Sequence, residues 1–319
     1  MNKKLSKILS IVLPLLLGVF LVIYIYRQFT PQELADVSNS FKHANYLYVA
    51  ISLVFGLTGF WARAYRWKYT LNHIGYTAPF SVKFGAVSIT YLMNMLIPRS
   101  GEVSRALVLK RYADVPFDKG LGTIISERIV DLILLIIVMA ATIILQFDMV
   151  KDYLVDIPFK KLLFYGIIAG ILFLGSVLFF MYSKLGWVKK LKFKIAGLTE
   201  GVLSVFRMPN KWPFLLLSVY IWFSYVLMFY ITIYALPETA NLDFGSVATA
   251  FVVGSLAITF TNGGTGWFPV AVAKVLTVYG VPFTAGTAFG WIVWSSQVAL
   301  IIVLGGLSFL LLPLLHKRK

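Results

Sequence analysis

Long apolar stretches recur along the whole chain, and they constrain its fold more than any other feature. Each is on the order of 20 residues, the length that a helix needs to cross the hydrocarbon core of a bilayer. Of the 319 residues, 59% are hydrophobic and 13% are charged, and the mean hydropathy is +0.84. A soluble helical bundle could not bury so much apolar surface, because globular proteins are already about half apolar. The sequence therefore predicts an all-α, multi-pass integral membrane protein.

Six of the apolar stretches are long enough to be full transmembrane helices. The first is interpreted as a retained span rather than a cleaved signal peptide, because bulky residues (24–28) stand where small cleavage-site residues are expected. Two other segments, 81–97 and 245–261, are shorter, and each runs into Pro, Gly or Asn residues before another helical stretch. We expect each to form part of a helical hairpin, either re-entrant or fully spanning. The six expected spans are residues 8–26, 46–61, 120–146, 162–182, 212–236 and 283–315.

Basic residues lie on alternate loops, and this indicates an orientation. One set of loops holds most of the 29 Lys and Arg residues, while the opposite set is mainly acidic. Because loops rich in Lys and Arg stay in the cytoplasm, the basic set is predicted to be cytoplasmic, with both termini, at the cell (inner) membrane. The same rule accounts for the formal charge of +16 without a nucleic-acid partner. The basic set comprises Lys3, Lys4, Lys7, Arg63, Arg66, Lys68, Lys83, residues 99–119, Arg128 and residues 184–211 and 317–319; the acidic set comprises Glu33, Asp36, Asp148, Asp152, Asp156, Glu238 and Asp243.

This orientation gives the two hairpins opposite directions. The first enters and leaves from the cytoplasmic side, and the second enters and leaves from outside. Residues 46–146 and 212–315 therefore form a predicted inverted repeat within a single membrane domain of residues 1–319. Transporters built from inverted repeats place the substrate site at the interface between the repeats.

A basic segment, residues 183–211, connects the two predicted repeats. Apolar residues such as Trp187, Leu191 and Phe193 are interleaved with its lysines. The segment is predicted either to lie as an amphipathic helix on anionic lipid or to be a solvated loop that fixes the topology.

The bend of the first hairpin is a candidate site. Pro98 ends a helix and Gly101 permits an unusual backbone, so peptide groups are freed at a depth where only protein or a water-filled cavity satisfies them. Ser100 is expected to cap a helix beginning at Gly101, with Glu102 and Arg105 one turn apart and able to pair. Arginines near a helix N-terminus suit a phosphate or carboxylate; the alternative is an ordinary basic loop. The candidate residues are Asn94, Pro98, Arg99, Gly101, Glu102 and Arg105.

A second cluster, Glu127, Arg128 and Asp131, lies inside an apolar stretch. The spacing places all three on one helix face, and Arg128 is within reach of the first bend. Ionisable groups at the bilayer centre cost roughly 2.5–3.5 kcal/mol each on insertion scales, so they usually face the interior of a bundle. Two interpretations stay open: a functional site, or ion pairs that lock helices together near the interface.

The bend of the second hairpin is rich in glycine. Glycines allow close backbone approach and exposed amides, as a binding site between broken helices needs. A lone glycine-rich run is weak by itself, and its position opposite the first bend is what favours a site. Lys274 follows and either neutralises an anion or extends to the membrane surface. The candidate residues are Asn262, Gly263, Gly264, Gly266 and Lys274.

Several chemistries find no support in the sequence. Cysteine is absent, which excludes disulfides, thiolate zinc sites and a cysteine nucleophile. The histidines, His43, His73 and His316, are far apart in sequence and have no carboxylate at metal-ligand spacing, so no metal site is expected. The chain has no P-loop motif. We therefore expect no cofactor, and any transport is expected to be downhill or coupled to an ion gradient.

At these residues the chain resembles the lysylphosphatidylglycerol synthase transmembrane-domain family of flippase-like membrane proteins. The resemblance covers nearly the whole chain and is carried by the first bend, the downstream charged cluster and the segment Gly263-Gly264-x-Gly266. Asn262 and Pro269 depart from the proline and glutamate that this family often has there, and Trp291 and Trp294 stand in a region that often holds an arginine. The resemblance implies a stand-alone flippase-like protein without the soluble aminoacyltransferase domain.

The leading hypothesis is that the chain translocates, or binds during translocation, a polar or charged phospho- or glycolipid. Arg99, Arg105 and Arg128 are expected to hold its phosphate, so the expected partners are membrane lipids with an anionic or phosphate-bearing head group. The chain is expected not to be an enzyme and to have no catalytic residue. Two rivals stay open, an intramembrane lipid-linked transferase that uses Glu102, Glu127 or Asp131, and a non-transporting membrane partner of an envelope enzyme. The oligomeric state, the lipid and the direction of movement are not indicated.

Overall fold

The computed structural model describes residues 27, 29–147, 208–261 and 263–316. Over these ranges the chain forms nine α-helices, one short 3-10 turn and no strand, which confirms the all-α prediction. The expected spans 8–26 and 162–182, and nearly all of the basic segment 183–211, lie outside the described residues. The helices are α2 (Pro31–His43), α3 (Tyr46–His73), α4 (Phe80–Leu96), α5 (Gly101–Ala113), α6 (Phe117–Leu145), α10 (Lys211–Thr232), α11 (Phe244–Phe260), α12 (Trp267–Val278) and α13 (Phe283–Leu315), with the turn η1 at Ile233–Ala235.

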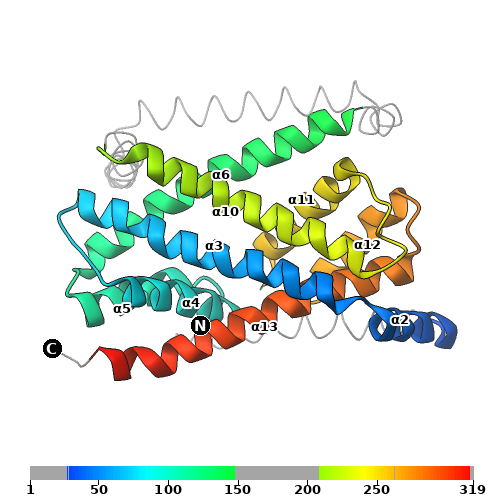
Figure 1. Ribbon diagram of the computed structural model, residues 1–319, viewed down its shortest axis with the longest axis horizontal. Helices are drawn as coiled ribbons and strands as arrows, with labels where there is room; N and C mark the ends of the chain where they lie inside the picture. Colours follow the sequence, from blue (N-terminus) through cyan, green and yellow to red (C-terminus); the bar gives the residue numbers. More distant parts are fainter. Residues whose placement is uncertain (1–26, 28, 148–207, 262, 317–319) are drawn as a thin grey trace, which may run out of the picture.

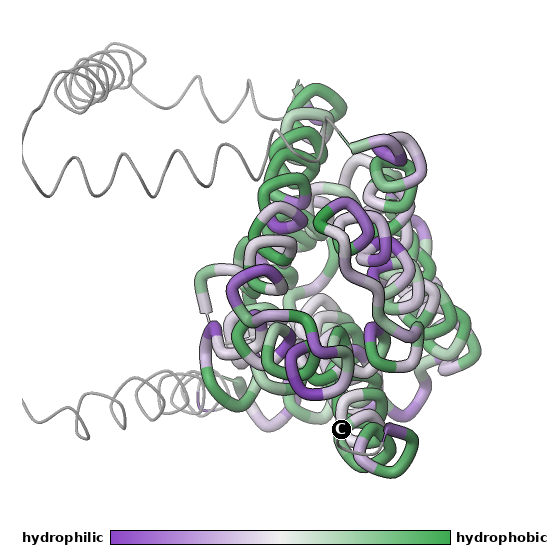
Figure 2. Tube along the Cα trace, turned by 90° about the vertical axis from the view of Figure 1, so that its left-hand side faces the viewer, coloured by the Kyte–Doolittle hydropathy of each residue, from purple (hydrophilic) through white to green (hydrophobic). Residues whose placement is uncertain are grey.

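Four helices, α3, α6, α10 and α13, are long and apolar enough to cross a membrane. Large apolar side chains stay exposed along them, among them Ile136, Ile144, Leu216 and Leu310. Figure 2 looks along the bundle, and apolar residues colour much of the Cα trace of its helices. Such a surface is unfavourable in water and favourable against lipid tails. The chain is a multi-pass integral membrane protein.

The two hairpins are α4–α5 and α11–α12. Their helices have 17, 13, 17 and 12 residues, so at 1.5 Å per residue none exceeds about 26 Å, less than the roughly 30 Å of a hydrocarbon core. In Figure 1, α4–α5 lies toward one end of the bundle and α11–α12 toward the other. This arrangement favours re-entrant hairpins. The structural equivalence of residues 46–146 and 212–315 stays a prediction.

The helix α3 differs from the expected span, which ended at residue 61. The helix continues to His73, and it carries Arg63 and Arg66 on its buried face. The assignment of these two arginines to a cytoplasmic loop is therefore wrong. Hydropathy predicts the end of this helix too early, because it counts the arginines as charged. It takes no account of the acidic groups on another helix that neutralise them.

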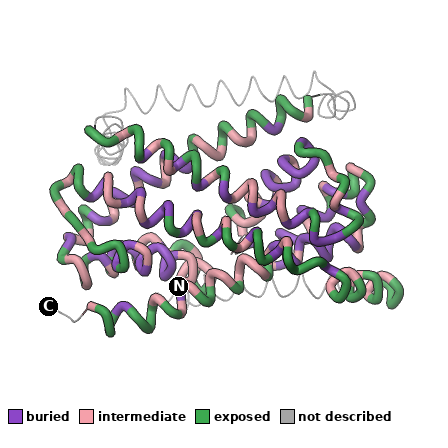
Figure 3. The backbone as a smooth tube through the Cα atoms, in the orientation of Figure 1, coloured by how far each residue is buried: buried purple, intermediate pink, exposed green. Residues whose placement is uncertain are grey.

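Each hairpin is packed into its own apolar cluster, and Figure 3 shows many buried residues along the helices of both hairpins. The cluster around α11–α12 contains Phe229, Phe251, Phe268 and Phe289 among its buried residues, and the three other rings all lie within 6.5 Å of the Phe229 ring. The cluster around α4–α5 includes Trp67, which is fully buried. These two clusters pack the hairpins against the long helices. The bend of each hairpin lies between the two clusters.

Asp243 caps the N-terminus of α11. Its carboxylate accepts hydrogen bonds from the Ser246 hydroxyl and from the amides of Gly245 (2.8 Å) and Ser246 (3.3 Å). The hydrogen bond from the Ser246 hydroxyl, followed by those from the amides, lowers the pKa of Asp243 below its ordinary value. The ionised Asp243 cap therefore contributes its full stability above the pKa that Asp243 has in the unfolded chain, near 4. That stability is lost as the pH falls through the lower pKa of Asp243 in the folded protein.

We expect Asp243→Ala to lower the free energy of unfolding by about 1 kcal/mol at neutral pH, because the amides of the first turn lose their acceptor. Asp243→Asn keeps an acceptor and is expected to lose less. Thermal unfolding in detergent, measured at neutral and at acidic pH, checks this prediction. Equal stability of Asp243→Ala and wild type at neutral pH would contradict it.

Candidate functional site

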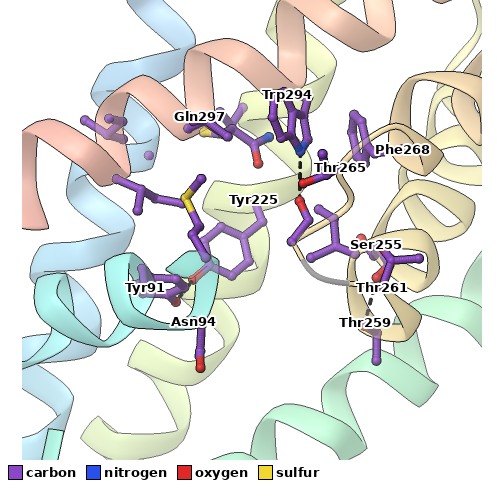
Figure 4. Close-up of a pocket in the computed structure, with 18 of the residues that line it drawn as sticks. Tyr91, Asn94, Tyr225, Ser255, Thr259, Thr261, Thr265, Phe268, Trp294 and Gln297 are labelled. Atoms are coloured by element: carbon purple, nitrogen blue, oxygen red, sulfur yellow. Dashed lines mark hydrogen bonds between the residues drawn. The ribbon is translucent and has the colours of Figure 1, made fainter. Parts of the chain in front are cut away.

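A cavity of about 820 Å³ lies between the two hairpins. Its wall includes residues from α3, α4, α5, α6, α10, α11, α12 and α13, together with both interhelical bends. Figure 4 shows Tyr91, Asn94 and Tyr225 on one side and Ser255, Thr259 and Thr261 on the other, with Trp294 and Gln297 contributed by α13. Segments about 170 residues apart in sequence thus enclose one space.

The first bend is built by Asn94 and Gly101. The α5 helix begins at Gly101 with Ser100 at the N-cap position, as expected. The Ser100 hydroxyl, however, donates to the carbonyls of Met93 (3.0 Å) and Ile97 (2.8 Å). The side chain of Asn94 performs the capping instead, because its Oδ1 accepts from the Gly101 amide at 2.7 Å. Arg99 adopts a left-handed backbone conformation, with φ of 59°, and it lines the cavity.

Asp131 is the centre of a buried ion-pair network. It is 7% exposed, and it accepts from Arg63 Nη1 at 2.7 Å and from Arg66 Nη1 at 2.8 Å. Arg66 also donates to the Ser218 hydroxyl on α10 at 2.8 Å. One carboxylate of α6 therefore joins α3 to α6, and Arg66 extends the network to α10.

Glu127, one turn earlier on α6, forms a second buried group. Its Oε2 lies 2.9 Å from Arg105 Nη1 and 3.4 Å from Arg66 Nη2. The Arg105 guanidinium stacks over the Trp67 ring, with its Cζ 3.7 Å from the ring centroid. Neither Arg105 nor Glu127 lines the cavity. The structure therefore corrects two expectations: Arg105 pairs with Glu127 rather than with Glu102, and it does not face a ligand.

Arg128 and Glu102 face the cavity. Their side chains are 34% and 29% exposed, and Arg128 Nε lies 3.4 Å from Glu102 Oε1. Arg128 Nη1 also lies 3.8 Å from Asp131 Oδ2. The expected reach of Arg128 to the first bend is confirmed. This looser pair is accessible from the cavity, unlike the buried pairs behind it.

Charge in this region is unbalanced. Five arginines (Arg63, Arg66, Arg99, Arg105 and Arg128) accompany three carboxylates (Glu102, Glu127 and Asp131). Among the side chains that line the cavity itself, three arginines (Arg63, Arg99 and Arg128) accompany two carboxylates (Glu102 and Asp131), an excess of one positive charge. In the low dielectric of a membrane interior this excess attracts an anion strongly.

Of the candidate site residues predicted at and after the second bend, only some line the cavity. Gly263, Gly264 and Gly266 all have positive φ, at 65°, 79° and 75°, which explains the glycines there. Gly263 lines the cavity, and its carbonyl accepts from Trp294 Nε1 at 2.8 Å. Lys274 is exposed on α12 and does not line the cavity, so it is not placed to neutralise a ligand there. Asn262 lies outside the described residues.

The remaining wall of the cavity is aromatic and hydroxyl-rich. The phenol oxygens of Tyr91 and Tyr225 lie 2.8 Å apart, and Arg63 Nη2 donates to Tyr225 at 3.3 Å. The indole N–H of Trp222 is buried and has no hydrogen-bond partner within the described parts of the chain. Ser255, Thr259 and Gln297 add further polar groups. The cavity thus combines a cationic wall with a wall of neutral hydrogen-bonding and apolar groups. Across the same described residues, no cluster of His, Asp or Glu is arranged to hold a metal ion.

The chain belongs to the family described as the lysylphosphatidylglycerol synthase TM region, whose model matches residues 11–305. This confirms the family resemblance seen in the sequence. No solved structure matches the chain.

One curated relative is named glycosyltransferase AglD, from Haloferax volcanii. It is 27% identical over 131 residues, which cover 41% of this chain and 20% of the relative. The chain thus matches about a fifth of the length of that protein. Because a relative carries the name of an enzyme, the expectation that this chain is not an enzyme is corrected.

Proposed function

We propose that this protein binds a polar lipid with a phosphate-bearing head group in the central cavity and moves it between leaflets. The observation that carries the proposal is one cavity, between the two helical hairpins, whose wall includes Arg99 and Arg128. Both arginines are accessible from the cavity, and together with Arg63 they suit the oxygens of a phosphate.

The cavity would lower the main barrier to lipid movement. A charged head group that leaves water for hydrocarbon loses its solvation, at a cost of several kcal/mol or more. Arginines and hydroxyls would replace that solvation during passage, and the aromatic wall would contact apolar parts of the lipid. In this proposal Glu102 holds Arg128 in place until a phosphate competes for it, while Asn94, Pro98, Gly101 and the glycines of the second bend shape the walls.

We further propose that the end of the bundle carrying the α3–α4 and α5–α6 connections is cytoplasmic, with both termini. Support comes from the distribution of charge. The α5–α6 connection and the adjoining helix ends carry three basic residues (Lys110, Arg111 and Lys119) and two acidic ones (Asp114 and Asp118). The connection before α11, on the opposite side, carries Glu238 and Asp243 and no Lys or Arg. Loops rich in Lys and Arg stay in the cytoplasm.

The test is lipid exchange between leaflets in proteoliposomes. We expect Arg99→Asn to slow exchange of a fluorescent phospholipid about ten- to a hundredfold, the value of one hydrogen bond to a charged group. Asparagine tolerates the left-handed backbone of residue 99, so the variant removes charge without adding strain. Lys110→Gln on the exposed side of α5 is the matched control and should exchange lipid at the wild-type rate. Equal rates for Arg99→Asn and wild type would refute the assignment of the site.

A lipid-linked transferase is the second candidate, favoured by the name of the curated relative. Glu102 and Asp131 are the carboxylates that face the cavity, and both lie within 4 Å of Arg128. Incubation of purified protein with a nucleotide sugar and a polyprenyl phosphate, followed by mass spectrometry, tests this candidate. Product formation that Glu102→Gln abolishes would establish it, and the absence of product with an active lipid exchange would favour translocation.

A further inference from the structure

Lys83, in the first turn of α4, is a largely buried lysine with no ion-pair partner in the described part of the chain. The residue as a whole is 6% exposed. Its ammonium nitrogen is not fully shielded from the surroundings, and among the described residues no carboxylate forms an ion pair with it. Buried charges in proteins are normally paired, because removing them from water is costly. Lys83 does not line the central cavity, so the proposed translocation does not account for it.

The surroundings of Lys83 make its charge still less favourable. It lies near the N-terminus of α4, where the helix dipole is positive and cations are destabilising. The nearby ammonium of Lys68 on α3 repels it further. Lys83 thus lies at the positive end of α4 with the ammonium of Lys68 nearby, and no acidic residue within the described ranges pairs with either lysine. This arrangement favours an anion from outside the chain.

The N-terminus of α4 also presents unused donors. Its N-cap residue is Pro79, which supplies no side-chain acceptor, and the first helical hydrogen bond is made by the Lys83 amide. The amides of Phe80, Ser81 and Val82 therefore have no helical acceptor. Side chains on a helix lean toward its N-terminus, so we expect the Lys83 side chain to extend toward the end of α4 that presents these amides. Free amides at a helix start bind phosphate oxygens.

An aromatic surface beside Lys68 and Lys83 sets the depth of the site. Trp61 stacks on Tyr65 with ring centroids 5.0 Å apart, and it lies 6.1 Å from Phe80. The Lys68 ammonium sits over the rings of Tyr65 (3.8 Å) and Tyr69 (4.9 Å). Trp61 and Phe80 are 47% and 39% exposed. Exposed Trp and Tyr rings gather where head groups meet hydrocarbon, and lysines there attract anionic lipids.

We propose that Lys83, Lys68 and the first turn of α4 bind the phosphate of an anionic membrane lipid at this interface, separately from the central cavity. The lipid is the expected source of the phosphate because the exposed aromatic rings beside it can contact acyl chains and glycerol, which a free phosphate lacks. The site is independent of the proposed translocation. The bound lipid phosphate supplies a counter-ion for Lys83 and Lys68, and the bound lipid fixes the N-terminus of α4 at the membrane interface.

The test compares thermal unfolding in a neutral detergent with and without short-chain phosphatidylglycerol. It is performed in an Arg99→Asn background, which weakens lipid binding in the cavity. We expect phosphatidylglycerol to stabilise this protein, and addition of Lys83→Met to raise the half-saturating lipid concentration about ten- to a hundredfold. Lys83→Met removes an unpaired buried charge, so without lipid it should be at least as stable as its parent. Lys110→Met is the matched control and should keep the full lipid response.

Two outcomes would overturn the proposal. The first is an equal response to phosphatidylglycerol with and without Lys83→Met. The second is equal stabilisation by millimolar inorganic phosphate in place of lipid, which would make the site one for free phosphate. A phosphatidylcholine of the same chain length should give little stabilisation, because its head group carries no net charge. None of these readouts measures lipid exchange, so they are separate from the test of translocation.

Discussion

Replacing Asp131 by asparagine is expected to destabilise the protein so strongly that little folded protein can be recovered from the membrane. Asparagine keeps the shape of the side chain but removes the charge that Arg63 and Arg66 share at 2.7 and 2.8 Å. Within the described part of the chain, Arg63 then has no carboxylate partner, and Arg66 keeps Glu127 at 3.4 Å and the Ser218 hydroxyl. Loss of one member of a buried ion pair costs about 3–5 kcal/mol. Total stabilities are about 5–15 kcal/mol, so this loss is a large part of the whole.

The measurement is the yield of monodisperse protein after extraction, together with thermal unfolding of what is recovered. Glu102→Gln is the control, because it breaks a half-exposed pair with Arg128 and should change stability by at most about 1 kcal/mol. Adding Arg63→Met to Asp131→Asn removes the stranded charge and should recover part of the lost stability. If Asp131→Asn and Glu102→Gln behave alike, the network does not hold the helices together.

The sequence predicted those features that depend on local pattern. The apolar stretches identified the long helices, and Pro98 and the glycines marked both bends. The spacing of Glu127, Arg128 and Asp131 placed them on the inner face of one helix. Each of these predictions needs only neighbours within about a turn, where propensity and periodicity carry the information.

The sequence did not reveal the partners of those charges. Arg63 and Arg66 were assigned to a loop because they follow a span of suitable length, yet they pair with carboxylates more than 60 residues away. One signal in the sequence could have identified these partners. Glu127 and Asp131, within an apolar helix, need more positive charge than Arg128 alone supplies. Arg63 and Arg66 are spaced to lie on the same face of α3 as Gly56 and Gly59, a face that can pack closely against another helix. Arg105 was misjudged for the same reason, because its partner Glu127 lies on another helix.

The five arginines around the cavity therefore fall into two groups, one structural and one accessible to a ligand. Arg66 and Arg105 are buried against carboxylates and aromatic rings, and they join helices. Arg99 and Arg128 face the cavity and stay accessible. Arg63 belongs to both groups, because it pairs with Asp131 and also lines the cavity. A ligand phosphate would thus meet a cationic wall that the buried pairs hold in place, without those pairs having to break.

Replacing Gly101 by alanine is expected to disrupt the first hairpin and its cavity wall. A Cβ at this position would lie 2.3 Å from the Thr90 carbonyl oxygen and 2.6 Å from Asn94 Nδ2. The carbonyl is backbone of α4 and cannot move aside cheaply, so α5 must shift away from α4. Overpacking of this kind costs about 1–3 kcal/mol, and loss of the Asn94 cap on the Gly101 amide adds about 1 kcal/mol.

Gly122→Ala on α6 is the matched control, since a Cβ there meets nothing within 4 Å. Alanine in an exposed helical position favours the helix by up to about 1 kcal/mol, so this variant should be as stable as wild type or more so. Thermal unfolding in detergent compares the two variants, and lipid exchange in proteoliposomes reports on the cavity. Because Pro98, Arg99 and Glu102 line the cavity beside Gly101, Gly101→Ala should lower both stability and exchange. A Gly101→Ala protein with the stability and exchange rate of Gly122→Ala would mean that the close approach of α4 and α5 does not shape the site.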